Sequence, residues 1–128
     1  MVLPASMRLR GHRCFNRLHR SSKRQHGALM VLRVAAGDSN LLRRELRDVQ
    51  ERTCRCALVI SSKVSKRAVR RNRLRRLLHQ HLRQQLEHRG DLAGRWVLIS
   101  LRPEASEAEP SQLLEECDSL LSSAGLGQ

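Results

Sequence analysis

Aromatic side chains are almost absent from this sequence. Only 2% of its residues are aromatic, with one Phe, one Trp and no Tyr. The core therefore has to be built from Leu, Val, Ile and Ala, and the chain offers few rings on which nucleic-acid bases could stack. We expect Trp96 to lie in the core, whereas for Phe15 core packing and ligand contact are equally open.

Patterns typical of metal sites, membrane spans and protein nucleases are also missing. The four cysteines include no Cys-x-x-Cys pair, so we expect reduced thiols and no protein-held zinc. His79 and His81 are two residues apart and would point to different faces of a helix. The longest apolar stretches reach about half of the roughly 20 residues that a membrane span needs. Outside the C-terminal segment, no acids are paired in the way that holds the metal ions of a nuclease.

The residue present in excess is arginine. The 128 residues include 25 Lys and Arg against 12 Asp and Glu, a formal charge of +13, and all but three of the cations are Arg. The planar guanidinium binds phosphate oxygens in a bidentate manner. We therefore expect a polyanionic partner, with nucleic acid favoured over an anionic membrane surface.

The charge is unevenly distributed along the chain. Residues 103–128 carry six acids and no Lys or Arg, so residues 1–102 carry a charge of +19. We expect this acidic C-terminal segment to stay away from the polyanion. The length predicts a single domain over residues 1–128.

Short apolar runs bounded by turn residues predict three strands. They cover residues 28–35, 56–61 and 96–101, and the last is apolar along almost its whole length. Between the first two, residues 38–52 are polar and predict a loop with a helical turn through residues 41–49.

Apolar residues at three- and four-residue spacing predict helices. Residues 9–20 form a short amphipathic helix with interleaved arginines, and residues 65–88 form the longest helix, with Ser65 as its N-cap. A last helix begins near Pro110 or Ser111 and ends at Gly125. Together the elements predict an α+β fold of two layers, a small mixed sheet packed against helices in the order α-β-β(-β)-α-β-α.

Cations are most concentrated over residues 63–76, where eight of fourteen residues are Lys or Arg. Like charges on adjacent helical turns destabilise the helix unless an anion neutralises them. The segment therefore indicates a polyanion-binding helix. A solvated helix face or a localisation-like basic run is the alternative.

These residues resemble the bacterial ribonuclease P protein family. The strand over residues 56–61 is followed by Ser62-Lys63-Val64 and then by Ala-Val-Arg-Arg-Asn-Arg-Leu-Arg-Arg over residues 68–76, whose Arg-Asn-Arg core is the family's signature. The resemblance extends to Arg8-Leu9-Arg10 with Phe15, to Lys23-Arg24, to residues 97–103 and to the acidic C-terminal helix.

The resemblance implies the protein subunit of ribonuclease P, a cytoplasmic ribonucleoprotein. In that enzyme a catalytic RNA binds Mg²⁺ and removes the 5′ leader from precursor tRNA, while one small basic protein per RNA holds the leader and reduces repulsion between the RNAs. The chain would then contain no catalytic residue and no cofactor of its own, and would bind neither DNA nor membranes. The family's parallel strands are joined by a left-handed crossover through the basic helix, an exception to the usual hand.

The resemblance also implies two sets of site residues. The helix that contacts the catalytic RNA would present Arg71, Asn72, Arg73, Arg75 and Arg76, and Lys63, Lys66, Arg67 and Arg70 would extend that surface. The leader-binding cleft, between the first helix and the sheet, would offer Arg8, Arg10, Phe15 and Arg17.

Three positions depart from the family pattern. Ser62 replaces the first of two usual lysines, Ala57 replaces a common glycine, and His19 stands where a second aromatic residue is usual. We therefore expect a less aromatic cleft than the family norm. The main alternative function is a non-catalytic RNA-binding protein of the ribosomal kind. A helix-turn-helix DNA binder is disfavoured because no helix and tight turn precede Ser65.

Overall fold

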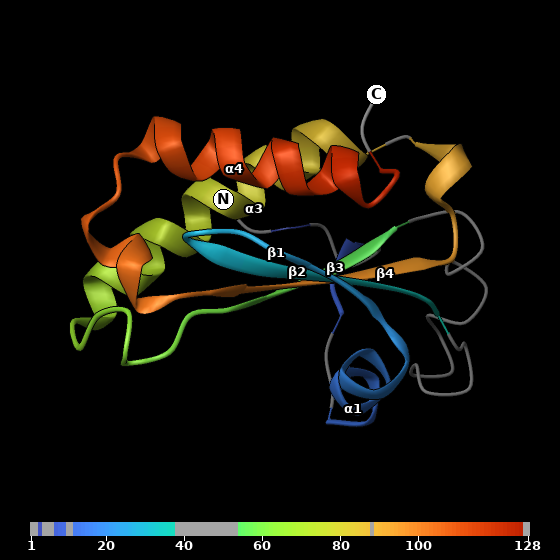
Figure 1. Ribbon diagram of the computed structural model, residues 1–128, viewed down its shortest axis with the longest axis horizontal. Coiled ribbons are helices and arrows are strands. Elements are labelled where there is room, and N and C mark those ends of the chain that lie inside the picture. Colours follow the sequence, from blue (N-terminus) through green and yellow to red (C-terminus); the bar gives the residue numbers. More distant parts are fainter. Residues whose placement is uncertain (1–2, 4–6, 10–11, 38–53, 88, 127–128) are drawn as a thin grey trace.

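The computed structural model describes residues 3, 7–9, 12–37, 54–87 and 89–126. Within these residues the chain forms three α-helices, four strands and two 3₁₀ helices (Figure 1). The predicted helical turn over residues 41–49 lies outside them. In chain order the elements are α1 (His12–Ser21), β1 (Lys23–His26), β2 (Met30–Ala36), β3 (Arg55–Val59), α3 (Ala68–Leu86), η4 (Gly90–Leu92), β4 (Arg95–Leu101), η5 (Pro103–Glu107) and α4 (Pro110–Ser123).

The four strands form one mixed sheet in the order β1-β2-β4-β3. β1 and β2 are an antiparallel hairpin, β2 and β4 are antiparallel, and β3 is parallel to β4. The chain therefore passes from β3 through α3 to its parallel neighbour β4, as a crossover connection requires. The α+β class is confirmed; the hand of this crossover stays a prediction. The predicted order left a further strand open; that strand is β1, which contains Lys23-Arg24, where the resemblance had suggested only a basic turn.

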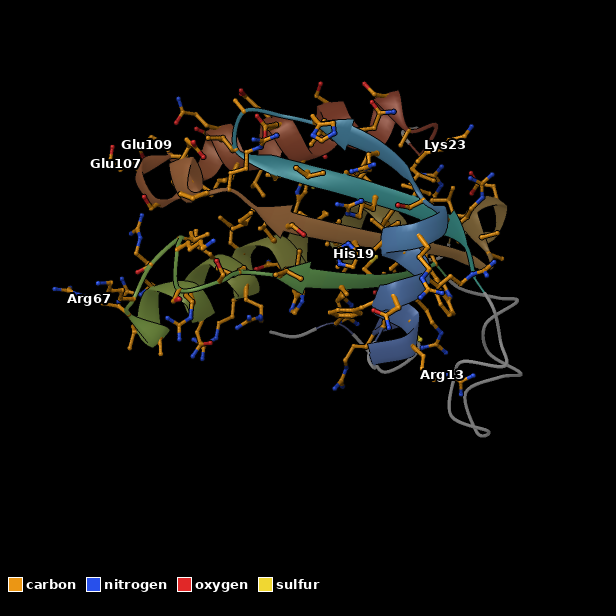
Figure 2. The ribbon with its side chains drawn as sticks, turned by 60° about the horizontal axis from the view of Figure 1, so that its bottom comes forward. Arg13, His19, Lys23, Arg67, Glu107 and Glu109 are labelled. Carbon is orange, nitrogen blue, oxygen red and sulfur yellow. The ribbon has the colours of Figure 1, made fainter. Side chains whose placement is uncertain are left out.

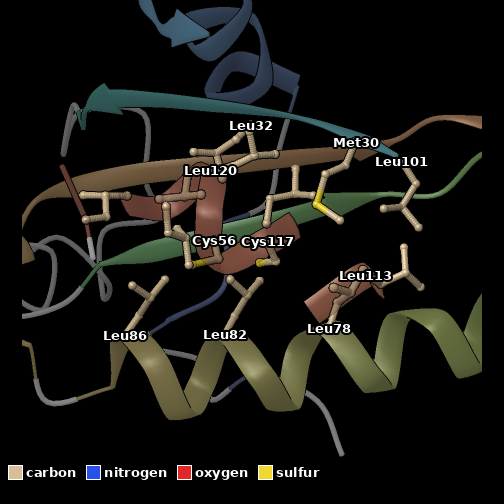
Figure 3. Packing of buried hydrophobic residues seen from close by; sticks show 14 of the residues in the cluster. Met30, Leu32, Cys56, Leu78, Leu82, Leu86, Leu101, Leu113, Cys117 and Leu120 are labelled. Carbon is tan, nitrogen blue, oxygen red and sulfur yellow. The ribbon is translucent and has the colours of Figure 1, made fainter. Parts of the chain in front are cut away.

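The main core lies between one face of the sheet and the helices α3 and α4 (Figure 1). Leu78, Leu82 and Leu86 of α3 point at the sheet and at α4 (Figure 3), and each is at most 2% exposed. Their four-residue spacing confirms the predicted helical stripe, and each buried leucine contributes about 1.5–3 kcal/mol relative to an exposed one. Val69, off this stripe in the first turn, is 65% exposed.

The opposite face of the sheet is covered by α1 (Figure 1). Trp96 is 0% exposed there, which confirms its place in the core. A Cβ atom on Gly37 would lie 2.2 Å from Nε1 of Trp96, so only glycine fits beside the ring. This face adds a partial third layer to the two that were expected. Its small cluster comprises Leu9, Cys14, Leu18, Ala35, Ala57, Trp96 and Leu98.

The start of α3 differs from the prediction, whereas the start of α4 agrees with it. Ser65 is not the N-cap of α3, because its Oγ accepts a hydrogen bond from the N–H of Arg67 (3.2 Å) in a local turn, and Arg67 precedes the first helical residue. α4 begins at Pro110 as expected, and Gln112 accepts a hydrogen bond from the N–H of Glu109 (2.9 Å). Gly125, with φ of 81°, ends α4 in the left-handed conformation typical of a helix C-terminus.

Two acids of α4 hold neighbouring elements. The Glu116 carboxylate accepts hydrogen bonds from the N–H groups of Ala28 (2.9 Å) and Leu29 (2.8 Å) in the β1–β2 turn. Asp118 lies 2.6 Å from Nε2 of His81 on α3. The acidic helix thus fixes the hairpin and α3 relative to each other.

All four cysteines lie in described parts of the chain as buried thiols. Burial raises the pKa of Cys117 to about 12, and a hydrogen bond with Cys54, together with burial, raises the pKa of Cys56. Protonated thiols of this kind are poor nucleophiles. No helix of the described residues has the length and apolar character needed to cross a membrane.

Candidate RNA interface

The predicted basic segment forms one continuous surface over the β3–α3 turn and the first turns of α3. We call it the basic helix surface. Val64 is buried and anchors the turn, whereas Lys63, Lys66 and Arg67 are exposed. Figure 2 shows Arg67 at the end of the molecule remote from α1. The surface comprises Lys63, Lys66, Arg67, Arg70, Arg71, Asn72, Arg73, Arg75 and Arg76, the nine residues expected from the sequence, all exposed except the half-buried Arg71 and Arg75.

The side chains of this surface donate hydrogen bonds to carbonyl and amide oxygens. Nη1 of Arg71 donates to the carbonyl of Ser65 (2.8 Å), and Nη1 of Arg75 donates to Oδ1 of Asn72 (3.2 Å). Within the described residues, the ion pairs are His81–Asp118, Arg83–Glu87 and Arg89–Asp91, all beyond residue 76. The charges of the basic helix surface are therefore uncompensated by any carboxylate in that part of the chain.

The position of these cations on the helix increases their attraction for anions. The first turn of α3 contains no acid, although the positive end of the helix dipole favours negative charge there. The backbone N–H groups that point out of the helix start, the dipole and the clustered guanidinium groups together favour a phosphate ligand at this end of the helix.

The beginning of the acidic segment lies against this surface, and its separation from the polyanion stays a prediction. Nη2 of Arg70 donates a hydrogen bond to the carbonyl of Ser106 in η5, which brings the beginning of residues 103–128 against α3. The contact uses a backbone oxygen, so the segment positions Arg70 without neutralising it.

A cavity of about 240 Å³ lies at the β3 edge of the sheet, between α1 and α3. Arg8 and Phe15, two of the predicted cleft residues, line it together with Arg75 of the basic helix surface. The cavity is therefore continuous with that surface. Its remaining lining residues are Leu3, Leu9, Cys56, Ala57, Leu58 and His79.

Backbone contacts fix Arg8 at this cavity. The segment around it runs beside β3, pairing Arg8 with Cys56, and Nε of Arg8 donates to the carbonyl of Leu3 (2.8 Å). The fully buried Arg55 donates from Nη1 to the carbonyl of Arg8 (2.9 Å). Burial lowers the pKa of Arg55.

Arg17, a third predicted cleft residue, does not line this cavity. Nε of Arg17 donates to the carbonyl of Ala36 (3.0 Å), at the end of β2, so Arg17 lies on the other side of α1 from Phe15. Arg10 lies outside the described residues.

His79 is the lining residue that sequence reasoning missed. Burial, followed by the charges of Arg75 and Arg8, lowers the pKa of His79 to about 4, so the ring is neutral at pH 7. Its Nδ1 is buried without a hydrogen-bond partner. The position of His79 in the helical repeat gives no sign of a cavity, because the cavity forms only where the N-terminal segment meets α1 and α3.

Comparison with known sequences identifies the family. The sequence model of the family described as Ribonuclease P matches residues 3–125. The chain belongs to the ribonuclease P protein family. It is 85% identical to the ribonuclease P protein component of Parasynechococcus marenigrum (strain WH8102), over 100% of both chains, and 75% identical to that of Synechococcus sp. (strain CC9902), over 98% of both.

Solved ribonuclease P proteins share the fold at low sequence identity. The protein from Staphylococcus aureus superposes with a TM-score of 0.74 at 15% identity, covering 95% of this chain and 98% of that one. The protein from Thermotoga maritima gives 0.68 at 20% identity, covering 91% and 96%. The Arg-Asn-Arg signature at residues 71–73 thus occurs in a chain that has the fold of a ribonuclease P protein. The comparisons give no support to the alternative of a ribosomal protein.

Proposed function

We propose that the basic helix surface binds the catalytic RNA of ribonuclease P and that the cavity binds the 5′ leader of precursor tRNA. As a ribonuclease P protein component, the chain is a subunit of a bacterial tRNA-processing endoribonuclease in which the RNA supplies the chemistry. In this proposal one protein joins one RNA in the cytoplasm, the RNA holds the Mg²⁺ ions, and the protein contributes binding alone.

The observation that carries the proposal is the absence of acid partners on the basic helix surface, within the described residues. Five cations on the first turns of α3, with three more in the segment just before it, repel one another unless a polyanion neutralises them. A folded RNA presents phosphates at high density, and binding of the arginines would release the cations condensed on those phosphates. The geometry therefore suits a large structured RNA.

The leader proposal rests on the chemistry of the cavity. Leu9, Phe15 and Leu58 give it apolar walls, whereas Arg8 and Arg75 supply positive charge. A single-stranded nucleotide has an apolar base face and an anionic phosphate, and both fit this combination. Arg17, and Arg10 by sequence, would contact the leader outside the cavity.

Reconstitution with a bacterial ribonuclease P RNA tests the proposal. Precursor tRNA cleavage is measured at low Mg²⁺ with the RNA alone, with the RNA and this protein, and with an unrelated basic protein at equal concentration. We expect strong stimulation by this protein only, because shape-specific placement of charge, and not charge alone, brings the leader to the RNA. Equal stimulation by both proteins, or none by this one, contradicts the proposal.

A further inference from the structure

Val69 is an apolar side chain on the most highly charged surface of the molecule. It is 65% exposed, and no other large hydrophobic residue of the described chain is exposed. Together with the exposed Ala68, it interrupts the run of cations between Arg67 and Arg70. Single apolar residues scattered over a protein surface need no explanation. Val69, however, lies inside the basic helix surface, where charged side chains surround it.

Val69 lies on the side of α3 that faces away from the core. Leu78 comes nine residues after it, and at about 100° per residue the two side chains point to opposite sides of the helix. Leu78 is 0% exposed and points at the sheet (Figure 3). The exposed Arg73 and Arg76, four and seven residues after Val69, share its outer row. Val69 therefore begins the row of side chains that a partner of this surface would meet first.

The fold does not explain a valine at this position. β-Branched residues are less favourable in a helix than Arg, Lys or Gln, which occupy the rest of the outer row or flank it. A hydrophobic staple would join the residue before the N-cap to the fourth helical residue, and these are Lys66 and Arg71. Val69 also belongs to neither core cluster. A contact that removes its methyl groups from water would therefore come from a partner.

The chemistry of Val69 indicates which part of an RNA it would contact. An apolar group gains nothing from a phosphate, so its partner differs from that of the neighbouring arginines. The minor groove of helical RNA is wide and shallow and exposes riboses and base edges, whereas side chains cannot read the deep, narrow major groove. If α3 lay on the minor groove, Val69 would meet the riboses, and the surrounding cations would reach the phosphates that border the groove.

We propose that Val69 packs against riboses and base edges in the minor groove of a helical segment of the catalytic RNA. The inference rests on the proposed binding of that RNA by the basic helix surface, to which it adds an apolar contact. Every RNA presents phosphates, whereas an accessible minor groove at the right place depends on how the RNA folds. Val69 would thus contribute selectivity for the catalytic RNA, while the cations contribute the salt-dependent affinity.

The test measures the affinity of the full chain for the catalytic RNA and for an unrelated folded RNA of equal length. Val69→Ala should weaken binding of the catalytic RNA roughly five- to tenfold and leave the unrelated RNA unaffected. The slope of log affinity against log salt should not change, because no phosphate contact is lost. Val69→Lys should bind the unrelated RNA more tightly and the catalytic RNA more weakly. Because Val69 is exposed, both variants should keep the urea midpoint of the unmodified protein.

Gln80→Lys is the matched control for an added charge. Gln80 is exposed on the same side of α3, eleven residues after Val69, and lies outside the basic helix surface. This variant should not weaken binding of the catalytic RNA. If Gln80→Lys weakened it as much as Val69→Lys does, the loss would come from the added charge and the inference would fail.

Other outcomes also overturn the inference. Unchanged binding of the catalytic RNA by Val69→Ala, or tighter binding by Val69→Lys, would show that charge alone acts at this position. A smaller salt slope in Val69→Ala would mean that the substitution displaces the arginines. Equal losses with both RNAs would remove the selectivity. Failure of the unmodified protein to bind the catalytic RNA would instead refute the proposed function itself.

Discussion

The two halves of α3 share one helix but differ in the partners of their side chains. Residues 68–76 carry the cations that no acid of the described chain neutralises, and only Leu74 among them is buried. Residues 77–86 contribute three buried leucines, and the side chains of His81 and Arg83 pair with Asp118 and Glu87. In the half that packs in the core, acids of the protein neutralise the charges. In the half where no acid does so, we infer that RNA phosphates neutralise them.

Removing a leucine from the second half should give the largest effect. Leu82→Ala creates a cavity under a side chain that is 0% exposed, and we expect the free energy of unfolding to fall by about 2–5 kcal/mol. Urea denaturation measures the loss, and RNA affinity of the folded fraction should stay unchanged. Weaker RNA binding at conditions where the variant is fully folded would break the division of the helix into two roles.

Removing a cation from the first half should act on binding alone. Arg73 is exposed, so Arg73→Gln should weaken catalytic-RNA binding by about 1.5–3 kcal/mol and leave the free energy of unfolding within about 0.5 kcal/mol. Arg83→Gln, on the same helix but paired with Glu87, is the control for charge. The salt slope of RNA binding should decrease for Arg73→Gln and not for the control. A comparable loss of affinity in both variants would mean that net charge decides binding.

The two halves of α3 could be predicted from the sequence, because the second half has a periodic pattern of leucines and the first half has a continuous run of cations. Leucines at four-residue spacing predict burial, and a run of cations predicts an anion partner whatever the tertiary structure. The start of the helix was missed because Ser65 uses its hydroxyl in a turn before Arg67, a local alternative to capping.

The features missed from sequence are those that exist only through long-range pairing. β1 consists of polar residues on an exposed edge, so no apolar pattern marks it, and hydrogen bonding to β2 alone makes it a strand. Arg24 and Arg33 become neighbours only through that register. His79 meets Arg8 only because the N-terminal segment runs beside β3.

His79 lies near the junction of the two halves, and its titration should give an intermediate effect. The unfolded state binds a proton near pH 6.5, whereas the folded state does so only near pH 4, so the unfolded state binds more protons between these values. Stability should therefore decrease as pH falls from 6.5 to 4, by about 1–2 kcal/mol for this partly solvated group. Urea denaturation across this range should show a shallower decrease for His79→Gln. An identical pH profile in both proteins would show that His79 is not held neutral.

Neutralising Asp118, the acid that pairs with His81 in the second half of α3, should have the smallest effect on stability. It tests most directly whether the two halves of the helix are electrostatically separate. The side chain of Asp118 is 49% exposed, and a surface ion pair of this kind contributes about 0.2–1 kcal/mol. Asp118→Asn should therefore lower the free energy of unfolding by no more than that. Glu115→Gln, an exposed acid on the same helix, is the control. RNA affinity should be equal in both variants, because Asp118 contacts the second half of α3 and is not part of the basic helix surface. If Asp118→Asn alone strengthened RNA binding, the charge of Asp118 would also act on the cations of residues 68–76. The two halves of α3 would then not be electrostatically separate.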